Sequence, residues 1–132
     1  MGKSRPDTSA IALDSGALIG LERADDRIRA LCREALRTGV RILVPAPVLA
    51  QVWREGRRQA VLATLLKGKT TEVAQLDRVL AKAIGILCGR SGTSDVVDAC
   101  LALIARRERA LVVTSDVDDL LRLDPGLPVE RV

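Results

Sequence analysis

Four aspartates of this chain have residue types and spacings that suit metal-dependent chemistry: Asp14, Asp95, Asp98 and Asp116. The first and the last of them each follow a short apolar run that is typical of a buried parallel strand. Parallel sheets bind ligands at the carboxyl ends of their strands, so Asp14 and Asp116 are predicted to meet at one edge of a sheet. Asp95 and Asp98 lie three residues apart in the first turn of a predicted helix and therefore face roughly the same way.

Clustered carboxylates repel one another and raise each other's pKa values until a hard cation such as Mg²⁺ or Mn²⁺ holds them ionised. A bound metal activates water and polarises phosphoryl oxygens, which is the usual basis of metal-dependent phosphodiester hydrolysis. The sequence leaves structural interpretations open, with Asp14 and Asp116 as helix N-caps and Asp95 as a helix-start residue. Asp98 fits such an interpretation less well, because a carboxylate among apolar neighbours needs a partner or a metal.

Composition excludes several other kinds of chemistry. The chain has no His, so imidazole catalysis and His-ligated zinc are excluded, and its single aromatic residue, Trp53, argues against a stacking platform for bases. The three cysteines lie in apolar surroundings, which favours buried residues of a reducing, cytoplasmic compartment over disulfides. No apolar run reaches the roughly 20 residues of a membrane helix, and the N-terminus lacks the apolar segment of a signal peptide.

The 132 residues fit one domain, expected over residues 10–132 after a frayed segment at residues 1–9. Short apolar runs alternate with helical spacings along the chain, which predicts an α/β fold with a parallel sheet covered on both faces. Strands are expected at residues 11–13, 41–44, 71–76, 110–114 and 128–132. Helices are expected at residues 15–21, 25–36, 47–55, 57–66, 77–88, 95–107 and 118–123, with a loop at 89–93. In the last of these helices Asp119 is expected at the surface or within reach of the site.

Four segments in this order resemble the PIN-domain family, and specifically the VapC ribonuclease toxins of bacterial type II toxin–antitoxin systems. They are residues 12–19 (ALDSGALI), 44–50 (VPAPVLA), 98–105 (DACLALIA) and 112–116 (VVTSD). The resemblance implies a three-layer PIN-like fold in which a short parallel sheet is flanked by helices. It also implies an endoribonuclease in which Mg²⁺ or Mn²⁺, held by Asp14, Asp98 and Asp116, activates a water to hydrolyse RNA. Supporting polar residues are implied beside the first and fourth acids: Ser15, Thr114 and Ser115.

Gln51 departs from the pattern of this family, because the second acid is usually a Glu. An amide accepts a hydrogen bond or offers a neutral oxygen, but it brings no charge. Asp95, one helical turn before Asp98, is the first residue expected to replace that charge, and Glu55 is a weaker substitute. If neither compensates, the chain is instead a catalytically weakened PIN-like binding module. A third interpretation is a PIN nuclease of RNA processing that has no antitoxin.

The net charge of +4 and the pI of about 9.4 suit an acidic partner. Four arginines near the predicted site are expected to bind RNA phosphates: Arg54, Arg57, Arg58 and Arg90. The alternative is that these arginines belong to solvated helix faces.

The resemblance also implies a homodimer and a small cognate antitoxin of the VapB type that covers the acidic pocket. Trp53 is interpreted either as core or as an anchor in a protein interface. Five apolar residues of the early helices are expected either to form a groove for the antitoxin or to belong to the core: Leu18, Ile19, Leu21, Ile28 and Leu31.

Overall fold

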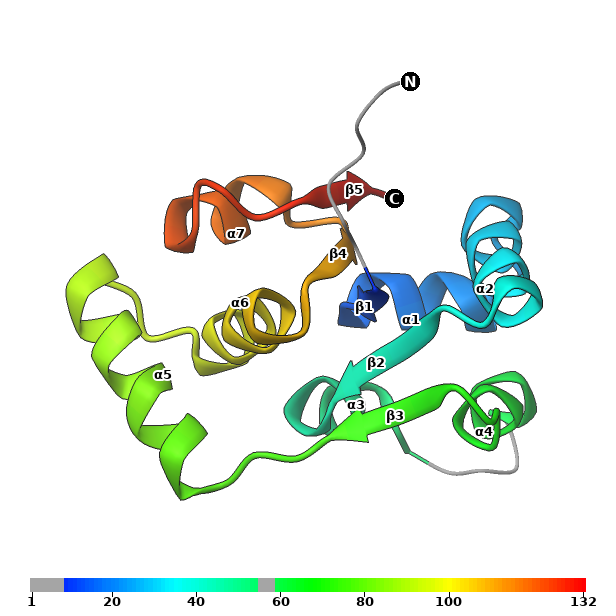
Figure 1. Ribbon diagram of the computed structural model, residues 1–132, viewed down its shortest axis with the longest axis horizontal. Coiled ribbons are helices and arrows are strands. Elements are labelled where there is room, and N and C mark those ends of the chain that lie inside the picture. Colours follow the sequence, from blue (N-terminus) through cyan, green and yellow to red (C-terminus); the bar gives the residue numbers. More distant parts are fainter. Residues whose placement is uncertain (1–8, 55–58) are drawn as a thin grey trace.

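Strands and helices alternate along most of the chain in the computed structural model, which describes residues 9–54 and 59–132 (Figure 1). The strands are β1 (Ala10–Leu13), β2 (Arg41–Pro45), β3 (Thr71–Ala74), β4 (Ala110–Thr114) and β5 (Val129–Arg131). The helices are α1 (Ser15–Glu22), α2 (Asp26–Thr38), α3 (Ala46–Val52), α4 (Ala60–Leu66), α5 (Arg78–Ser91), α6 (Val96–Glu108) and α7 (Val117–Leu123). Within these residues, no helix is both long enough and apolar enough to cross a membrane.

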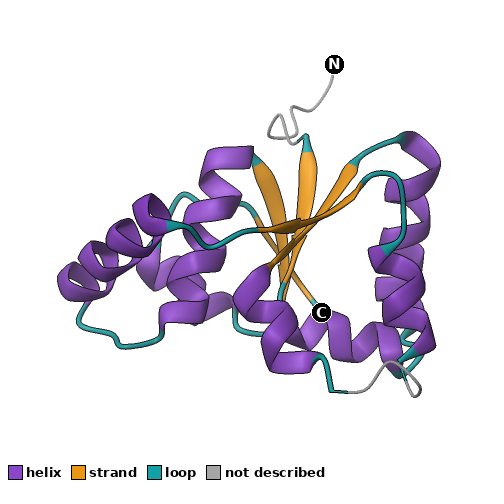
Figure 2. Ribbon diagram, turned by 90° about the horizontal axis from the view of Figure 1, so that it is seen from below, coloured by secondary structure: helices purple, strands orange, loops and turns teal. Residues whose placement is uncertain are grey.

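The strands form one sheet in the order β3-β2-β1-β4-β5, and every neighbouring pair is parallel. Successive side chains of β1 point to opposite faces. Ala10 and Ala12 pack with α5, α6 and α7, whereas Ile11 and Leu13 pack with α1, α2, α3 and α4. Figure 2 shows the strands between these groups of helices. The prediction of an α/β fold with a short parallel sheet covered by helices on both faces is therefore confirmed.

Capping residues and glycines set the bounds of the helices. Asp77 caps α5, because its side chain accepts a hydrogen bond from the backbone N–H of Leu80. The loop predicted at 89–93 is wrong in part, since α5 continues to Ser91 and ends at Gly92. Gly92 has a φ of +69° there, and its N–H bonds to the carbonyl of Cys88, as in many helix ends. Arg90 therefore lies in the last turn of α5 rather than in a loop.

Burial assigns most of the early apolar residues to the core. Leu18, Leu21 and Ile28 are buried, while Ile19 is exposed. Leu31 and Trp53 are half-buried and pack against the same cluster. Leu18, Leu21 and Ile28 thus fill the space between the sheet and α1 to α4. Ile19 faces outward, and Trp53 also lines an apolar hollow with Leu49 and Leu66.

The start of the described chain is held at the sheet. Ser9 was expected in a frayed segment, but its backbone N–H and its hydroxyl donate to the carbonyls of Arg109 and Glu108. The rest of that segment, residues 1–8, lies outside the described residues, and so do three residues considered for the site: Glu55, Arg57 and Arg58.

Candidate metal centre

The pairing of β1 with β4 brings two of the aspartates to the same edge of the sheet. The register places Leu13 opposite Val113, so the residues that follow them leave the sheet side by side. The backbone N–H of Asp14 continues this pairing by donating to the carbonyl of Val113 at 3.1 Å. Asp116 follows two residues after β4 ends, at the first turn of α7. The expected meeting of Asp14 and Asp116 thus results from a parallel pair of strands.

Asp98 reaches the same point from the first turn of α6. Each of Asp14, Asp98 and Asp116 offers a carboxylate oxygen, and these oxygens all lie within 4.8 Å of one another. Asp14 and Asp98 are buried, with 2% and 7% of their surfaces exposed, while Asp116 is exposed. We call these three residues the acidic group.

Thr114 links two members of the acidic group. Its hydroxyl donates to Oδ2 of Asp14 at 2.5 Å and accepts a hydrogen bond from the backbone N–H of Asp116 at 2.8 Å. Thr114 is fully buried, so both bonds are shielded from water. The other oxygen of Asp14 accepts from the N–H and the hydroxyl of Ser15. Asp14 is therefore fixed in orientation by hydrogen bonds to both of its carboxylate oxygens.

Asp95 caps α6, because Oδ1 of Asp95 accepts a hydrogen bond from the backbone N–H of Asp98 at 3.0 Å. The helix expected from residue 95 therefore begins at Val96, and Asp95 is its N-cap. Asp14 is likewise the N-cap of α1, whereas the carboxylate of Asp116 makes no capping bond in α7. Asp14 thus both caps a helix and belongs to the acidic group, whereas the carboxylate of Asp116 belongs to the acidic group without capping a helix.

The electrostatics of the acidic group favour a cation. Burial, together with the negative charges of Asp95 and Asp14, raises the pKa of Asp98 to about 7. The pKa of Asp116 is also raised, by burial and by the charges of Asp14 and Asp119. Repulsion of this kind is relieved when a divalent ion binds between the carboxylates.

The donor set fits a hard divalent cation. Three carboxylates supply oxygen ligands, which Mg²⁺ and Mn²⁺ prefer, and hydrogen bonds orient Asp14 as they commonly orient ligating carboxylates. Asp95 is not a member of the acidic group, and one of its oxygens is engaged by the backbone of Asp98.

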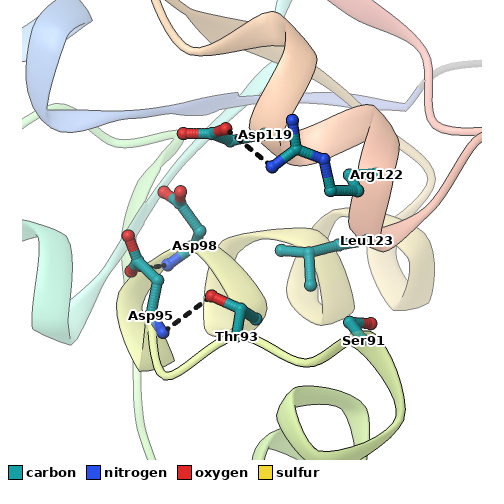
Figure 3. A pocket seen from close by; sticks show the side chains of 7 residues that line it. All are labelled: Ser91, Thr93, Asp95, Asp98, Asp119, Arg122 and Leu123. Carbon is teal, nitrogen blue, oxygen red and sulfur yellow. Dashed lines mark hydrogen bonds and ion pairs between the residues drawn. The ribbon is translucent and has the colours of Figure 1, made fainter.

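A pocket of about 250 Å³ opens beside the acidic group (Figure 3). Asp95, Asp98 and Asp119 line this pocket, and Figure 3 shows their carboxylates gathered at one side of it. The positive charge in its lining is Arg122 of α7, which pairs with Asp119 at 3.6 Å. Three further residues complete the lining: Ser91, Thr93 and Leu123.

The other residues predicted for the site lie around it rather than in this pocket. Gln51 is exposed on α3 and is not part of the lining. Arg54 donates from its guanidinium to the carbonyls of Ala50 and Trp53, which holds it to the end of α3. Arg90 is exposed on α5 and also lies outside the lining.

Two features of the site were missed from the sequence. Arg122 was not singled out, although its spacing of three residues from Asp119 is a signal for an ion pair on one helix face. Gly16 was not singled out either, and a Cβ at this position would lie 2.5 Å from Oγ of Ser115. The absence of a side chain at Gly16 therefore allows α1 to approach the segment that carries Asp116.

Comparisons with solved structures identify proteins of the same fold. The chain is similar to VapBC2 from Rickettsia felis bound to a DNA fragment from their promoter, with a TM-score of 0.71, 18% identity, and coverage of 93% of this chain and 98% of the other. It is similar to FitAB bound to an IR36 DNA fragment, with a TM-score of 0.63, 13% identity and coverage of 92% and 94%. It is also similar to FitAcB from Neisseria gonorrhoeae, with a TM-score of 0.61, 17% identity and coverage of 90% and 95%.

No family model and no curated protein sequence matches the chain. The likeness in structure at low identity establishes the PIN-like α/β fold over nearly the whole chain. The acidic group then defines the class of site that this fold carries here: a cluster of carboxylates at the carboxyl edge of a parallel sheet.

Proposed function

We propose that this protein is a metal-dependent endoribonuclease of the VapC type, which hydrolyses phosphodiester bonds of RNA. The observation that carries the proposal is the acidic group, in which oxygens of Asp14, Asp98 and Asp116 lie within 4.8 Å of one another. The resemblance of four sequence segments to VapC toxins and the likeness to the VapBC2 and FitAB structures support the same assignment.

Asp14, Asp98 and Asp116 would hold the Mg²⁺ or Mn²⁺ ion. When bound, such an ion supplies an activated water and polarises the scissile phosphoryl group. The chain's own residues prepare that site: Thr114 and Ser15 hold Asp14 in one orientation, and the backbone of Asp116 is anchored to Thr114. Asp98 is buried beside them and its pKa is raised to about 7, so its carboxyl would have to be ionised to hold such an ion.

We further propose that the protein acts in the cytoplasm as the toxin of a toxin–antitoxin pair, held inactive by a small cognate antitoxin of the VapB type. Free, buried cysteines are consistent with a reducing compartment. The proposal of a homodimer follows from the same resemblance. Co-expression with the product of a short neighbouring gene, followed by light scattering, tests the antitoxin and the dimer together.

A second candidate function is a PIN-like binding module with weakened catalysis. Gln51 favours it, because an amide stands where the resemblance expects the second acid. Gln51 is exposed on α3, and one carboxylate oxygen of Asp95 accepts the hydrogen bond that caps α6. Under this hypothesis the fold and the antitoxin contact remain, but metal affinity is low.

Calorimetric titration with Mn²⁺ tests the leading proposal, with Asp14→Asn as the paired variant. We expect the unmodified protein to bind Mn²⁺ and to cleave RNA in its presence, and we expect the Asn variant to do neither. Asp77→Asn is the matched control, because it removes one carboxylate at the N-cap of α5 and preserves a capping side chain. Mn²⁺ binding that persists in Asp14→Asn would contradict the assignment of the acidic group as the metal centre.

A further inference from the structure

Two arginines lie in hollows that adjoin the acidic group. Arg122 of α7 lines the pocket that Asp98 and Asp119 also line (Figure 3). Arg131 of β5 lines a second hollow of about 170 Å³, together with Ser115, Asp116 and Asp119. Because Asp119 borders both hollows, they adjoin, and each presents one guanidinium beside the aspartates.

Both guanidinium groups can exchange their present partners for a phosphate. Arg122 pairs with Asp119 across 3.6 Å, and the two side chains are 72% and 57% exposed. Exposed pairs of this kind contribute at most about 1 kcal/mol, so a doubly bonded phosphate competes readily for the arginine. Arg131 donates to the carbonyl of Ser115 at 3.5 Å, which places its positive charge beside the segment leading to Asp116 without neutralising it.

A nuclease with this site must bind a polyanion next to several carboxylates. Nearby positive charges are needed to offset the repulsion between the phosphates and these carboxylates. The arginines predicted for this task from the sequence are less well placed among the described residues. Arg54 is engaged by carbonyls at the end of α3, and Arg90 lies outside the pocket lining. Arg122 and Arg131 are in the hollows themselves.

We propose that single-stranded RNA crosses the acidic group over Asp119, with one phosphate bound by Arg122 and another bound by Arg131. This inference rests on the proposed function, and it adds the path of the substrate strand to it. The planar fork of each guanidinium suits two phosphate oxygens, and the acidic group contributes Asp98 to one hollow and Asp116 to the other. Arg122 and Arg131 are thus substrate-positioning residues in the two hollows that adjoin the acidic group.

Fluorescence anisotropy with a labelled, mixed-sequence single-stranded RNA tests this path. All proteins carry Asp98→Asn to prevent cleavage, and binding is measured at several KCl concentrations. We expect Arg122→Gln and Arg131→Gln each to weaken RNA binding roughly tenfold. Each is also expected to lower the slope of log affinity against log salt by about 0.7, the value for one neutralised phosphate of a single strand. Arg122→Lys should retain the slope, because it keeps the charge.

Arg33→Gln is the matched control, since Arg33 is exposed on α2, which packs on the opposite face of the sheet from α7. The proposed RNA path is wrong if both arginine variants have the same RNA affinities and salt slopes as Arg33→Gln. The same holds if the Asp98→Asn parent binds no RNA.

Cleavage by the protein with Asp98 intact separates this inference from the proposed function. If RNA is cleaved with Mn²⁺ but the arginine variants bind normally, the path is wrong and the function stands. If RNA is not cleaved but the variants lose affinity and slope, the function is wrong and the path stands.

Discussion

Thr114 donates its hydroxyl hydrogen to Oδ2 of Asp14, a residue 100 positions away in the sequence. The same oxygen of Thr114 accepts from the backbone N–H of Asp116. One buried hydroxyl therefore orients the carboxylate that directly follows β1 and anchors the start of the segment that follows β4. This arrangement fixes the Asp14 carboxylate and the backbone of Asp116, two of the three members of the acidic group.

Thr114→Val should therefore damage both stability and metal binding. Valine keeps the shape of threonine but leaves the Asp14 carboxylate and the Asp116 N–H without their shared partner. We expect a loss of about 1–3 kcal/mol in the free energy of unfolding, measured in urea, and Mn²⁺ affinity lower by at least about tenfold. Thr114→Ser retains the hydroxyl and should restore most of the affinity. Equal affinities for the Val and Ser variants would show that the hydroxyl is not what orients Asp14.

The metal-free protein should lose stability as the pH rises from 5 to 8. The pKa of Asp98 is about 7 in the folded chain and near 3.8 when unperturbed, so the folded state binds more protons across this window. The contribution of Asp98 to the free energy of unfolding is fully present below the pKa that Asp98 has in the unfolded chain. This contribution is lost as the pH rises through the pKa that Asp98 has in the folded chain. The loss should be on the order of 2 kcal/mol.

Asp98→Asn should flatten that pH profile and be more stable than the unmodified protein at pH 8, because it removes the buried charge. Glu34 and Glu108 have lowered pKa values, so their titration affects stability only at lower pH. Thermal unfolding in EDTA at several pH values measures the effect. A profile that falls equally steeply in Asp98→Asn would assign the titration to another group.

Asp95→Asn should separate capping from charge. Asparagine caps helices about as well as aspartate, so the stability of α6 should change by less than about 0.5 kcal/mol. Because Asp95 lies outside the acidic group, Mn²⁺ affinity should fall by less than in Asp98→Asn. Calorimetry on the two variants gives the comparison. Equal losses would instead mean that Asp95 supplies the charge that Gln51 lacks.

Gln51→Glu should strengthen Mn²⁺ binding severalfold. Gln51 lies on α3, which begins where β2 ends, so an added carboxylate there makes the electrostatic potential at this edge of the sheet more negative. Gln51→Ala, which removes the amide without adding charge, serves as the control and should leave the affinity unchanged. Calorimetry in low salt measures both. If the Glu variant binds Mn²⁺ no better, Gln51 is not the reason for weak binding, and the binding-module hypothesis loses its main support.

Local sequence patterns predicted the strands, the helices and the aspartates that follow them. Short apolar runs that alternate with helical spacings are typical of buried parallel strands, and acids that follow such strands are expected at one edge of the sheet. That reasoning correctly placed Asp14 and Asp116 together, and the apolar surroundings of Asp98 indicated that it needed a partner. The family resemblance rests on the same residues.

The tertiary structure decided which distant residues meet. Only the pairing of β1 with β4 places the Thr114 hydroxyl on Asp14, and only the packing of α7 beside α6 brings Arg122 to the pocket of Asp98. Local periodicity carries no information on strand order or on contacts between helices that lie far apart in sequence. It likewise did not decide between Gly89 and Gly92 as the end of α5, and the structure ends the helix at Gly92 and so includes Arg90 in it. The sequence by itself therefore determined which functional groups are available, carboxylates and no imidazole, while the packing of the elements decided which of these side chains lie close together.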